Sequence, residues 1–285
     1  MTSTIGNPIS WWARNIGAAG REVGSAVRHA GGDGSQSLPE VRAITFADLR
    51  LALRKGLDDF MAFRSDVMMA GLLYPAIGGI LIWIAIHKDS LPLAFPLLSG
   101  FALIGPLAAI GLYELSRRRE AGDEPTWADM FRVLHAPGFG AILMLGFALA
   151  IVFVLWLLTA WVLHSLTMGD ATYEGAVSFI TQVLTTSGGW AMMAIGIPLG
   201  FCFALLVLVV SLVSFPMLLD RDVGLPRAII TSYGVFRKSP VTVLAWGAIV
   251  AAGLILGALP MLLGLAVTLP ILGHATWHLY RRAVG

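Results

Sequence analysis

Residues 241–280 read VTVLAWGAIVAAGLILGALPMLLGLAVTLPILGHATWHLY, and this segment of 40 residues contains no Asp, Glu, Lys or Arg. A continuous helix of this length would measure about 60 Å, roughly twice the thickness of the hydrocarbon core of a bilayer. The segment must therefore turn back on itself, and Gly257–Pro260 is the expected place. We predict two membrane-spanning helices here, at about 241–258 and 260–280.

Four more stretches have the same apolar character, at about 68–86, 93–115, 139–163 and 195–219. The chain of 285 residues is 57% hydrophobic and only 13% charged, whereas about a quarter of the residues of a soluble domain are charged. The formal net charge of +2 gives no general attraction to nucleic acid. We therefore predict an all-α protein of the lipid bilayer, with six transmembrane helices arranged as three hairpins.

The distribution of basic residues predicts the orientation, because cytoplasmic loops carry the excess of Lys and Arg. With six spans, 18 of the 19 basic residues fall on one side and only Lys88 falls on the other. Five spans would leave Arg281 and Arg282 on the outside. The first residues also lack the basic stretch and apolar core of a signal peptide, so both termini are expected in the cytoplasm.

A cytoplasmic amphipathic helix is expected before each hairpin. Residues 1–40 are rich in Gly and Ser and are predicted to be a flexible cytoplasmic tail. We expect an amphipathic interfacial helix over 41–66 and the membrane domain over 67–285. Thr45 is the expected N-cap of that helix, with Asp48 three residues on. The predicted apolar face holds Phe46, Leu49, Leu53, Leu57, Phe60 and Met61, and the predicted polar face holds Asp48, Arg54, Lys55, Asp58 and Asp59.

The same pattern recurs along the chain. Residues 126–130, Thr-Trp-Ala-Asp-Met, are similar to residues 45–49, Thr-Phe-Ala-Asp-Leu, and residues 226–236 form a looser third version. Each even-numbered span also contains a proline and ends in charged residues. These features indicate three tandem units, each made of an interfacial helix and a hairpin. The alternative is that the segments are unrelated and look alike because any membrane hairpin needs a basic amphipathic segment before it.

Three motifs lie at the ends of the even-numbered spans: GLYELSRR at 111–118, SFPMLLDRDV at 214–223 and LGHATWHLYRR at 272–282. Together they resemble a bacterial family of integral membrane proteins catalogued as a domain of unknown function, over roughly residues 45–284. The resemblance implies a six-span protein of the bacterial inner membrane, without an established activity or agreed functional residues. Some relatives carry the label cytochrome c oxidase subunit I.

The oxidase label disagrees with the distribution of histidines. A haem–copper catalytic subunit needs several intramembrane histidine ligands, and here only His274 and His278 belong to one helix near the cytoplasmic side. A catalytic oxidase subunit is therefore not expected. An accessory or assembly role beside such an enzyme remains open.

His274 and His278 are four residues apart, so both imidazoles project from one face of a helix. They could bind a divalent metal or a haem, with Glu114 as a further metal ligand if the even-numbered spans converge. The alternative is an interfacial belt whose side chains bond neighbouring helices. That alternative needs no cofactor, and no cofactor is predicted. The single cysteine, Cys202, excludes an internal disulfide.

A cluster of charged residues is expected at the cytoplasmic ends of the even-numbered spans. These residues either hold the spans in register through ion pairs or present a docking surface to a partner. The cluster consists of Glu114, Arg117, Arg118, Asp220, Arg221, Asp222, Arg281 and Arg282.

Pairs of small residues four apart permit close packing of helices, Gly196 with Gly200 and Gly253 with Gly257. They either seal the bundle or form the face of a homo-oligomer. No Asp, Glu, Lys or Arg lies near the middle of a predicted span, which disfavours ion-coupled transport. The sequence also lacks catalytic motifs such as HExxH and GxSxG.

These features predict a protein that binds rather than catalyses. We expect a non-enzymatic accessory, assembly or scaffolding component of an inner-membrane complex, with a respiratory complex as one candidate. The first alternative is a permease or channel for a neutral or weakly polar small molecule, because prolines interrupt several spans. The second is an electron-transfer component that binds haem or a metal through His274 and His278.

Overall fold

The computed structural model describes residues 39–87, 91–136, 138–169 and 171–285. The predicted tail over 1–40 lies almost wholly outside these residues. The described part of the chain contains twelve α-helices and two 3₁₀-helices, and its one β-bridge joins Val41 to Val284. The helices are α2 (Phe46–Gly71), α3 (Leu73–His87), η1 (Leu91–Leu93), α4 (Ala94–Leu103), α5 (Gly105–Ala108), α6 (Ile110–Glu120), η2 (Trp127–His135), α7 (Phe139–Met168), α8 (Ala176–Thr185), α9 (Ser187–Ser211), α10 (Ser214–Asp220), α11 (Leu225–Lys238), α12 (Pro240–Ala258) and α13 (Leu265–Ala283).

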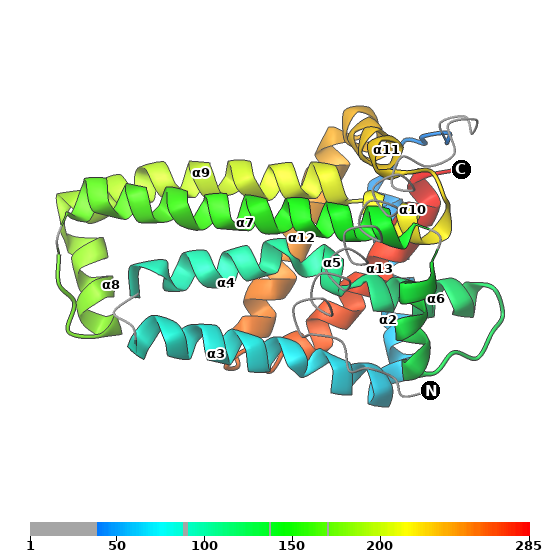
Figure 1. Cartoon of the computed structure of the whole chain (residues 1–285), viewed down its shortest axis with the longest axis horizontal. Coiled ribbons are helices and arrows are strands. Elements are labelled where there is room, and N and C mark those ends of the chain that lie inside the picture. The colour runs from blue at the N-terminus through cyan, green and yellow to red at the C-terminus, as the bar shows by residue number, and fades with distance from the viewer. Residues whose placement is uncertain (1–38, 88–90, 137, 170) are drawn as a thin grey trace, which may run out of the picture.

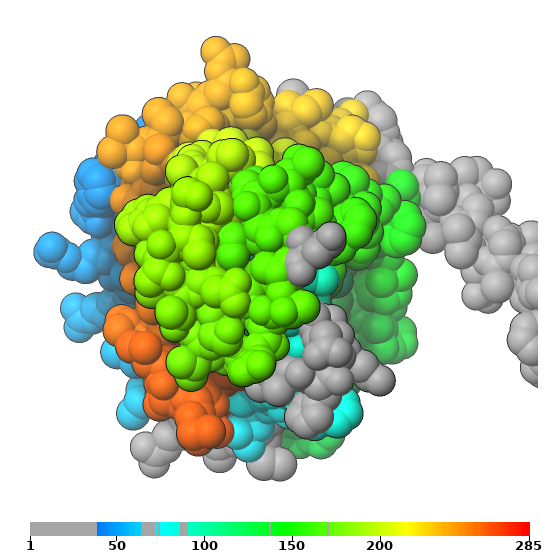
Figure 2. Space-filling view, turned by 90° about the vertical axis from the view of Figure 1, so that its left-hand side faces the viewer, coloured from blue at the N-terminus to red at the C-terminus, as the bar shows by residue number. Residues whose placement is uncertain are grey.

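The helices α3, α4, α7 and α9 run side by side along the length of the molecule, as Figure 1 shows. The short helix α8 lies across the left-hand end, and Figure 2 looks onto that end. The charged C-terminal ends of α6, α10 and α13 gather at the opposite end, together with α11. The molecule is therefore polarised, with an apolar end and a charged end.

Three helical segments among the described residues are long and apolar enough to cross a membrane: α7, the continuous pair α9–α10 over 187–220, and α12. Shorter apolar helices cover Pro75–Ala85 and Leu91–Leu103. The protein is thus all-α with several candidate spans, while six spans and their orientation stay predictions.

The surface along α7 and α9 has the character of a surface that faces lipid. Large apolar side chains are exposed there, among them Phe147, Trp161, Ile197 and Phe201, and Leu166 is 80% exposed. Soluble proteins rarely expose such large contiguous apolar patches. The buried core lies toward the charged end instead, where Phe215, Trp246, Trp277 and Tyr280 are almost inaccessible.

Prolines explain where two predicted spans are interrupted. A proline cannot donate a helical hydrogen bond, and its ring clashes with the carbonyl four residues earlier. The predicted span 93–115 is three short helices, with Pro106 at the start of α5. The predicted span 195–219 lies within the segment 187–220, which starts at Ser187. The α-helix is interrupted at residues 212 and 213, and Leu212 is the residue four positions before Pro216. In both segments the interruption thus coincides with a proline.

The turn in the 40-residue apolar segment lies where the sequence predicts it. The helix α12 ends at Ala258, and α13 begins at Leu265 rather than at residue 260. The turn is longer because Met261 and Leu262 adopt φ values of 51° and 66°, a region that non-glycine residues seldom enter. Gly257 lies at this turn, and a Cβ atom there would clash with the Thr268 side chain.

The first amphipathic helix differs from the prediction in length and in the residues of its buried face. It begins at Phe46 and continues past residue 66 to Gly71, and α3 follows from Leu73. Asp48 and Asp59 are buried, whereas Phe46 is 60% exposed and Leu57 and Met61 are also exposed. The reason is that α2 packs along α13, and α13 supplies polar partners for both carboxylates.

Candidate functional site: a polar junction at the charged end

The helices α2 and α13 cross at a glycine. A Cβ atom on Gly56 would lie 2.6 Å from the backbone nitrogen of Ala275 and 2.7 Å from the carbonyl oxygen of Ile271. Only a residue without a side chain permits this approach. The close crossing brings the polar side chains on either side of Gly56 within hydrogen-bonding distance of α13.

Asp59 is the centre of a buried group that we call the polar junction, made of Asp59 from α2, Ser116 and Arg119 from α6, and His274 and His278 from α13. The Asp59 side chain is 5% exposed. Its Oδ2 lies 2.6 Å from Ser116 Oγ and 2.8 Å from His278 Nε2, and its Oδ1 lies 2.6 Å from Arg119 Nη1. One carboxylate therefore joins three helices that are far apart in the sequence.

The charge of Asp59 determines which of its neighbours donate hydrogen bonds. An ionised Asp59 only accepts, so Ser116 must donate its single hydroxyl proton to Asp59 and His278 must donate from Nε2. His274 Nδ1 lies 2.8 Å from Ser116 Oγ and therefore donates to it. Burial acts to raise the pKa of Asp59, but the hydrogen bonds from His278 and Ser116 outweigh it, and the pKa lies below 3.8. Asp59 is therefore ionised at neutral pH.

The hypothesis of a metal site requires Glu114 to join His274 and His278, but its carboxylate is paired with two arginines instead. Its two carboxylate oxygens accept hydrogen bonds from Arg117, at 2.8 and 2.9 Å, and from Arg118, at 2.8 Å. This pairing raises the pKa of Arg117. Over the ranges that the structure describes, no group of three or more His, Cys, Asp or Glu side chains is placed to hold a metal ion.

The ends of α10 and α13 are joined through Asp220. Tyr280 donates its hydroxyl proton to Asp220 Oδ2 at 2.7 Å, and Arg281 Nη1 and Arg221 Nε lie 3.5 and 3.6 Å from the same oxygen. Asp222 is exposed and, within the described ranges, forms no ion pair. Of the predicted charged cluster, Asp220, Arg221 and Arg281 are thus brought together.

A second acid, Glu120, joins α6 to α13. Its Oε2 accepts a hydrogen bond from Trp277 Nε1 at 3.0 Å and lies 3.3 Å from Arg281 Nε. Arg281 therefore contacts acids from both α6 and α10. The even-numbered segments α6, α10 and α13 therefore converge through these ion pairs, and α6 and α13 also through the hydrogen bond between Ser116 and His274.

The predicted caps of the interfacial helices are present. Thr45 and Asp48 bond each other's backbone nitrogens, at 2.9 and 3.4 Å, and Thr126 and Asp129 form the same capping box at the start of η2. The similar pentapeptides at 45–49 and 126–130 thus have similar local structures. The second begins a 3₁₀-helix instead of an α-helix.

Each capping acid also pairs with an arginine from a different part of the chain. Asp48 Oδ1 lies 2.7 Å from Arg282 Nε at the end of α13. Asp129 Oδ1 lies 3.6 Å from Arg118 at the end of α6 and 3.0 Å from Arg132. The helices α2 and η2 are therefore held to the ends of α13 and α6 by the acids that cap them.

The glycine pairs face neighbouring helices of the same chain. Cβ atoms on Gly196 and Gly200 would lie 3.1 Å from Leu163 and 3.2 Å from Trp156 of α7. A Cβ atom on Gly253 would lie 3.0 Å from Leu272 of α13. These contacts favour the role of sealing the bundle, and a homo-oligomer face stays a prediction.

Taken together, the exposed apolar helices and the charged end define an α-helical integral membrane protein. Residues 94–220, a little under half of the chain, match the family described as predicted integral membrane protein, DUF2189. The match confirms the resemblance to a membrane family of unknown function and includes the motif at 111–118 and most of the motif at 214–223. The motif at 272–282 lies outside it. No curated protein and no solved structure matches the chain.

Proposed function

We propose that the chain is a six-span protein of the bacterial inner membrane that acts by binding, as an accessory, assembly or scaffolding component of a membrane complex. Its binding surface is the charged end of the bundle, which faces the cytoplasm. A respiratory complex is one candidate for the assembly.

The orientation is supported by the positions of the basic residues. Arg117, Arg119, Arg281 and Arg282 lie at the end where α6, α10 and α13 finish. Residues 164–190, which connect α7 to α9 at the other end, contain neither Lys nor Arg. Cytoplasmic loops carry the excess of basic residues, so the charged end belongs in the cytoplasm.

Three repeated units support the span count. The helix α2 packs on α13, η2 on α6, and α11 on α10, so each interfacial helix contacts the end of an even-numbered segment from another unit. The ends share the pattern Leu-x-Arg, at 115–117, 219–221 and 279–281. A cyclic arrangement of three similar hairpins accounts for both features.

The observation that carries the binding proposal is that the acids of the charged end already have partners within the chain. Asp59 and Asp220 accept hydrogen bonds from α13, and Glu114 accepts them from Arg117 and Arg118 of its own helix. The surrounding arginines are held in fixed positions, yet their side chains remain about half exposed, 40% at Arg119 and 57% at Arg282. A rigid surface with fixed charges binds a partner at a lower cost in conformational entropy.

Co-purification tests the proposal. The tagged full chain is solubilised from its native membrane in several mild detergents, and companions are measured by quantitative mass spectrometry. We expect a stoichiometric companion, reduced when Arg119 and Arg282 are replaced together by Gln and retained in an Arg54→Gln control. Recovery of the chain alone from every detergent would contradict the proposal. It would favour the permease or channel, which transport measurements on the reconstituted chain would then test.

A further inference from the structure

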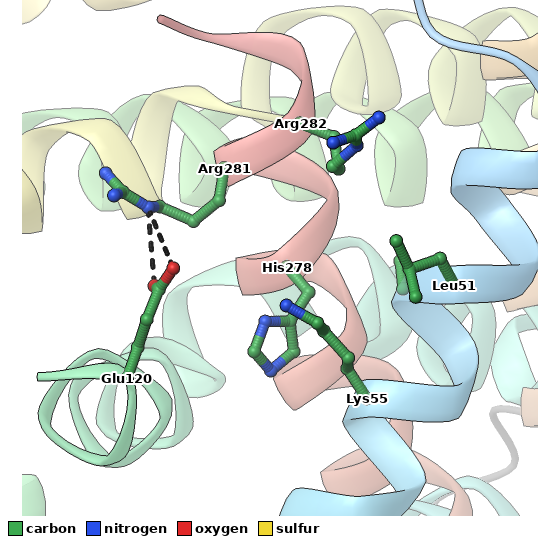
Figure 3. Close-up of a pocket in the computed structure, with 7 residues that line it drawn as sticks. Leu51, Lys55, Glu120, His278, Arg281 and Arg282 are labelled. Atoms are coloured by element: carbon green, nitrogen blue, oxygen red, sulfur yellow. Dashed lines mark hydrogen bonds and ion pairs between the residues drawn. The ribbon is translucent and has the colours of Figure 1, made fainter. Parts of the chain in front are cut away.

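We propose that a pocket between α2, α6 and α13 binds a phosphate group, carried by an anionic lipid or present as a free anion. The pocket has a volume of about 200 Å³ and opens at the charged end (Figure 3). Ala52 and Lys55 of α2, Glu120 of α6, and His278, Arg281 and Arg282 of α13 line it. This site goes beyond the proposed binding of a protein partner and does not depend on it.

The lining has an excess of positive charge. Three cations, Lys55, Arg281 and Arg282, surround one carboxylate, Glu120. Arg281 shares its charge with Glu120 and Asp220, as the dashed lines from Arg281 to Glu120 in Figure 3 show in part. Arg282 is paired with Asp48, so the charge of Lys55 is the one in the lining that no carboxylate of the described residues balances.

Lys55 is the cation without a partner. Among the described residues, its ammonium group forms no hydrogen bond or ion pair, and in Figure 3 its side chain extends from α2 toward His278. Arg282 donates from Nε to Asp48, and its two terminal nitrogens form no hydrogen bond with the residues that the structure describes. An ammonium group and a guanidinium group that line one pocket can both donate hydrogen bonds to a phosphate.

The walls of the pocket are fixed at both ends. Asp48 bonds Arg282 on one side of Lys55, and Asp59 bonds His278 on the other, so α2 cannot move away from α13. Between these two contacts Ala52 leaves room that a larger side chain would fill. Arg281 and Arg282 are thus held in position, which lowers the entropic cost of binding an anion.

The position of the pocket suits a lipid headgroup. The pocket lies beside the last turn of α13, where the helix leaves the proposed membrane region. Basic pockets between helices at the cytoplasmic surface are places where anionic headgroups bind. Free phosphate has the same chemistry, so a test must distinguish the two sources.

Binding is measured on the purified full chain without any partner. One arm titrates inorganic phosphate by calorimetry in non-ionic detergent. The other reconstitutes the chain in nanodiscs of phosphatidylcholine with phosphatidylglycerol and counts retained lipids by native mass spectrometry. Binding in both arms identifies any accessible phosphate as the ligand, and binding in the nanodisc arm alone identifies the lipid.

The decisive variant is Lys55→Gln, since Lys55 has no hydrogen bond or ion pair to lose within the described part of the chain. We expect affinity to fall about tenfold, the effect of one charged hydrogen bond, and Lys55→Arg to retain it. Arg54→Gln, the same loss of charge on the neighbouring exposed residue, is the matched control and should leave affinity unchanged. The proposal is overturned if the wild type binds in neither arm, or if Arg54→Gln weakens binding as much as Lys55→Gln. Either of these results would leave the proposed binding of a partner, and the co-purification experiment that tests it, unchanged.

Discussion

Asp59 Oδ2 and His278 Nε2 lie 2.8 Å apart, although 219 positions separate the two residues in the chain. This contact fixes the first described helix to the last one. Because Asp59 also bonds Ser116 and Arg119 of α6, the order of the charged end depends on a single buried carboxylate.

Replacing Asp59 by Asn should destabilise the protein strongly. The variant removes a buried charge from its hydrogen-bonded partners, which costs about 3 kcal/mol. Reversible unfolding in mixed detergent micelles measures the change in free energy. Asp58→Asn is the matched control, since Asp58 is exposed on the same helix, and it should change the free energy little. Equal stabilities of the two variants would show that the polar junction does not hold α2 in place.

Gly56→Ala should separate α2 from α13. The new methyl group would lie 2.6 Å from a backbone atom, which cannot rotate away, and overpacking of this kind costs about 1–3 kcal/mol. Gly79→Ala in α3 is the control, because a Cβ atom there has nothing within 4 Å and alanine favours a helix. Melting temperatures followed by tryptophan fluorescence should fall for the first and hold or rise for the second. A fall of the same size in both would contradict the close crossing.

The stability should depend on pH through Asp59. The folded-state pKa lies below 3.8, the value expected for the unfolded chain, because the hydrogen bonds from His278 and Ser116 exceed the effect of burial. A lowered pKa means that the contribution is complete well above pH 3.8 and is lost as the pH falls through the folded-state pKa. Unfolding measured from pH 6 downward should show this loss in the wild type and a smaller one in Asp59→Asn. Parallel curves for both proteins would refute the assignment.

The apolar helices were predictable because their signal is local. The helix α12 was expected at 241–258 and covers Pro240–Ala258, and α7 starts at Phe139 as expected. Capping by Thr45 and Asp48 was predictable for the same reason, since both partners lie within one turn. Length, apolar composition and turn residues suffice for features of this kind.

The polar junction was not predictable from the same reasoning. Asp59 was assigned to a solvent-exposed face because it is charged, but its burial depends on docking against His278, which no local pattern reveals. A signal was present: Asp48, Ala52 and Asp59 share one helix face with Gly56, and small residues between two acids mark a surface that another helix approaches closely. Ser116 and Arg119 were missed because their role requires Asp59.

The most direct test is where the charged end lies relative to the membrane. In a Cys202→Ala background, single cysteines are introduced as Asp123→Cys, Glu174→Cys, Asp222→Cys and Gly285→Cys, and spheroplasts are treated with a membrane-impermeant maleimide. Six spans with a cytoplasmic charged end predict labelling of Glu174→Cys in intact spheroplasts and of the other three only after permeabilisation. Labelling of Gly285→Cys in intact spheroplasts, as three spans would give, or of Asp123→Cys or Asp222→Cys, would contradict the account.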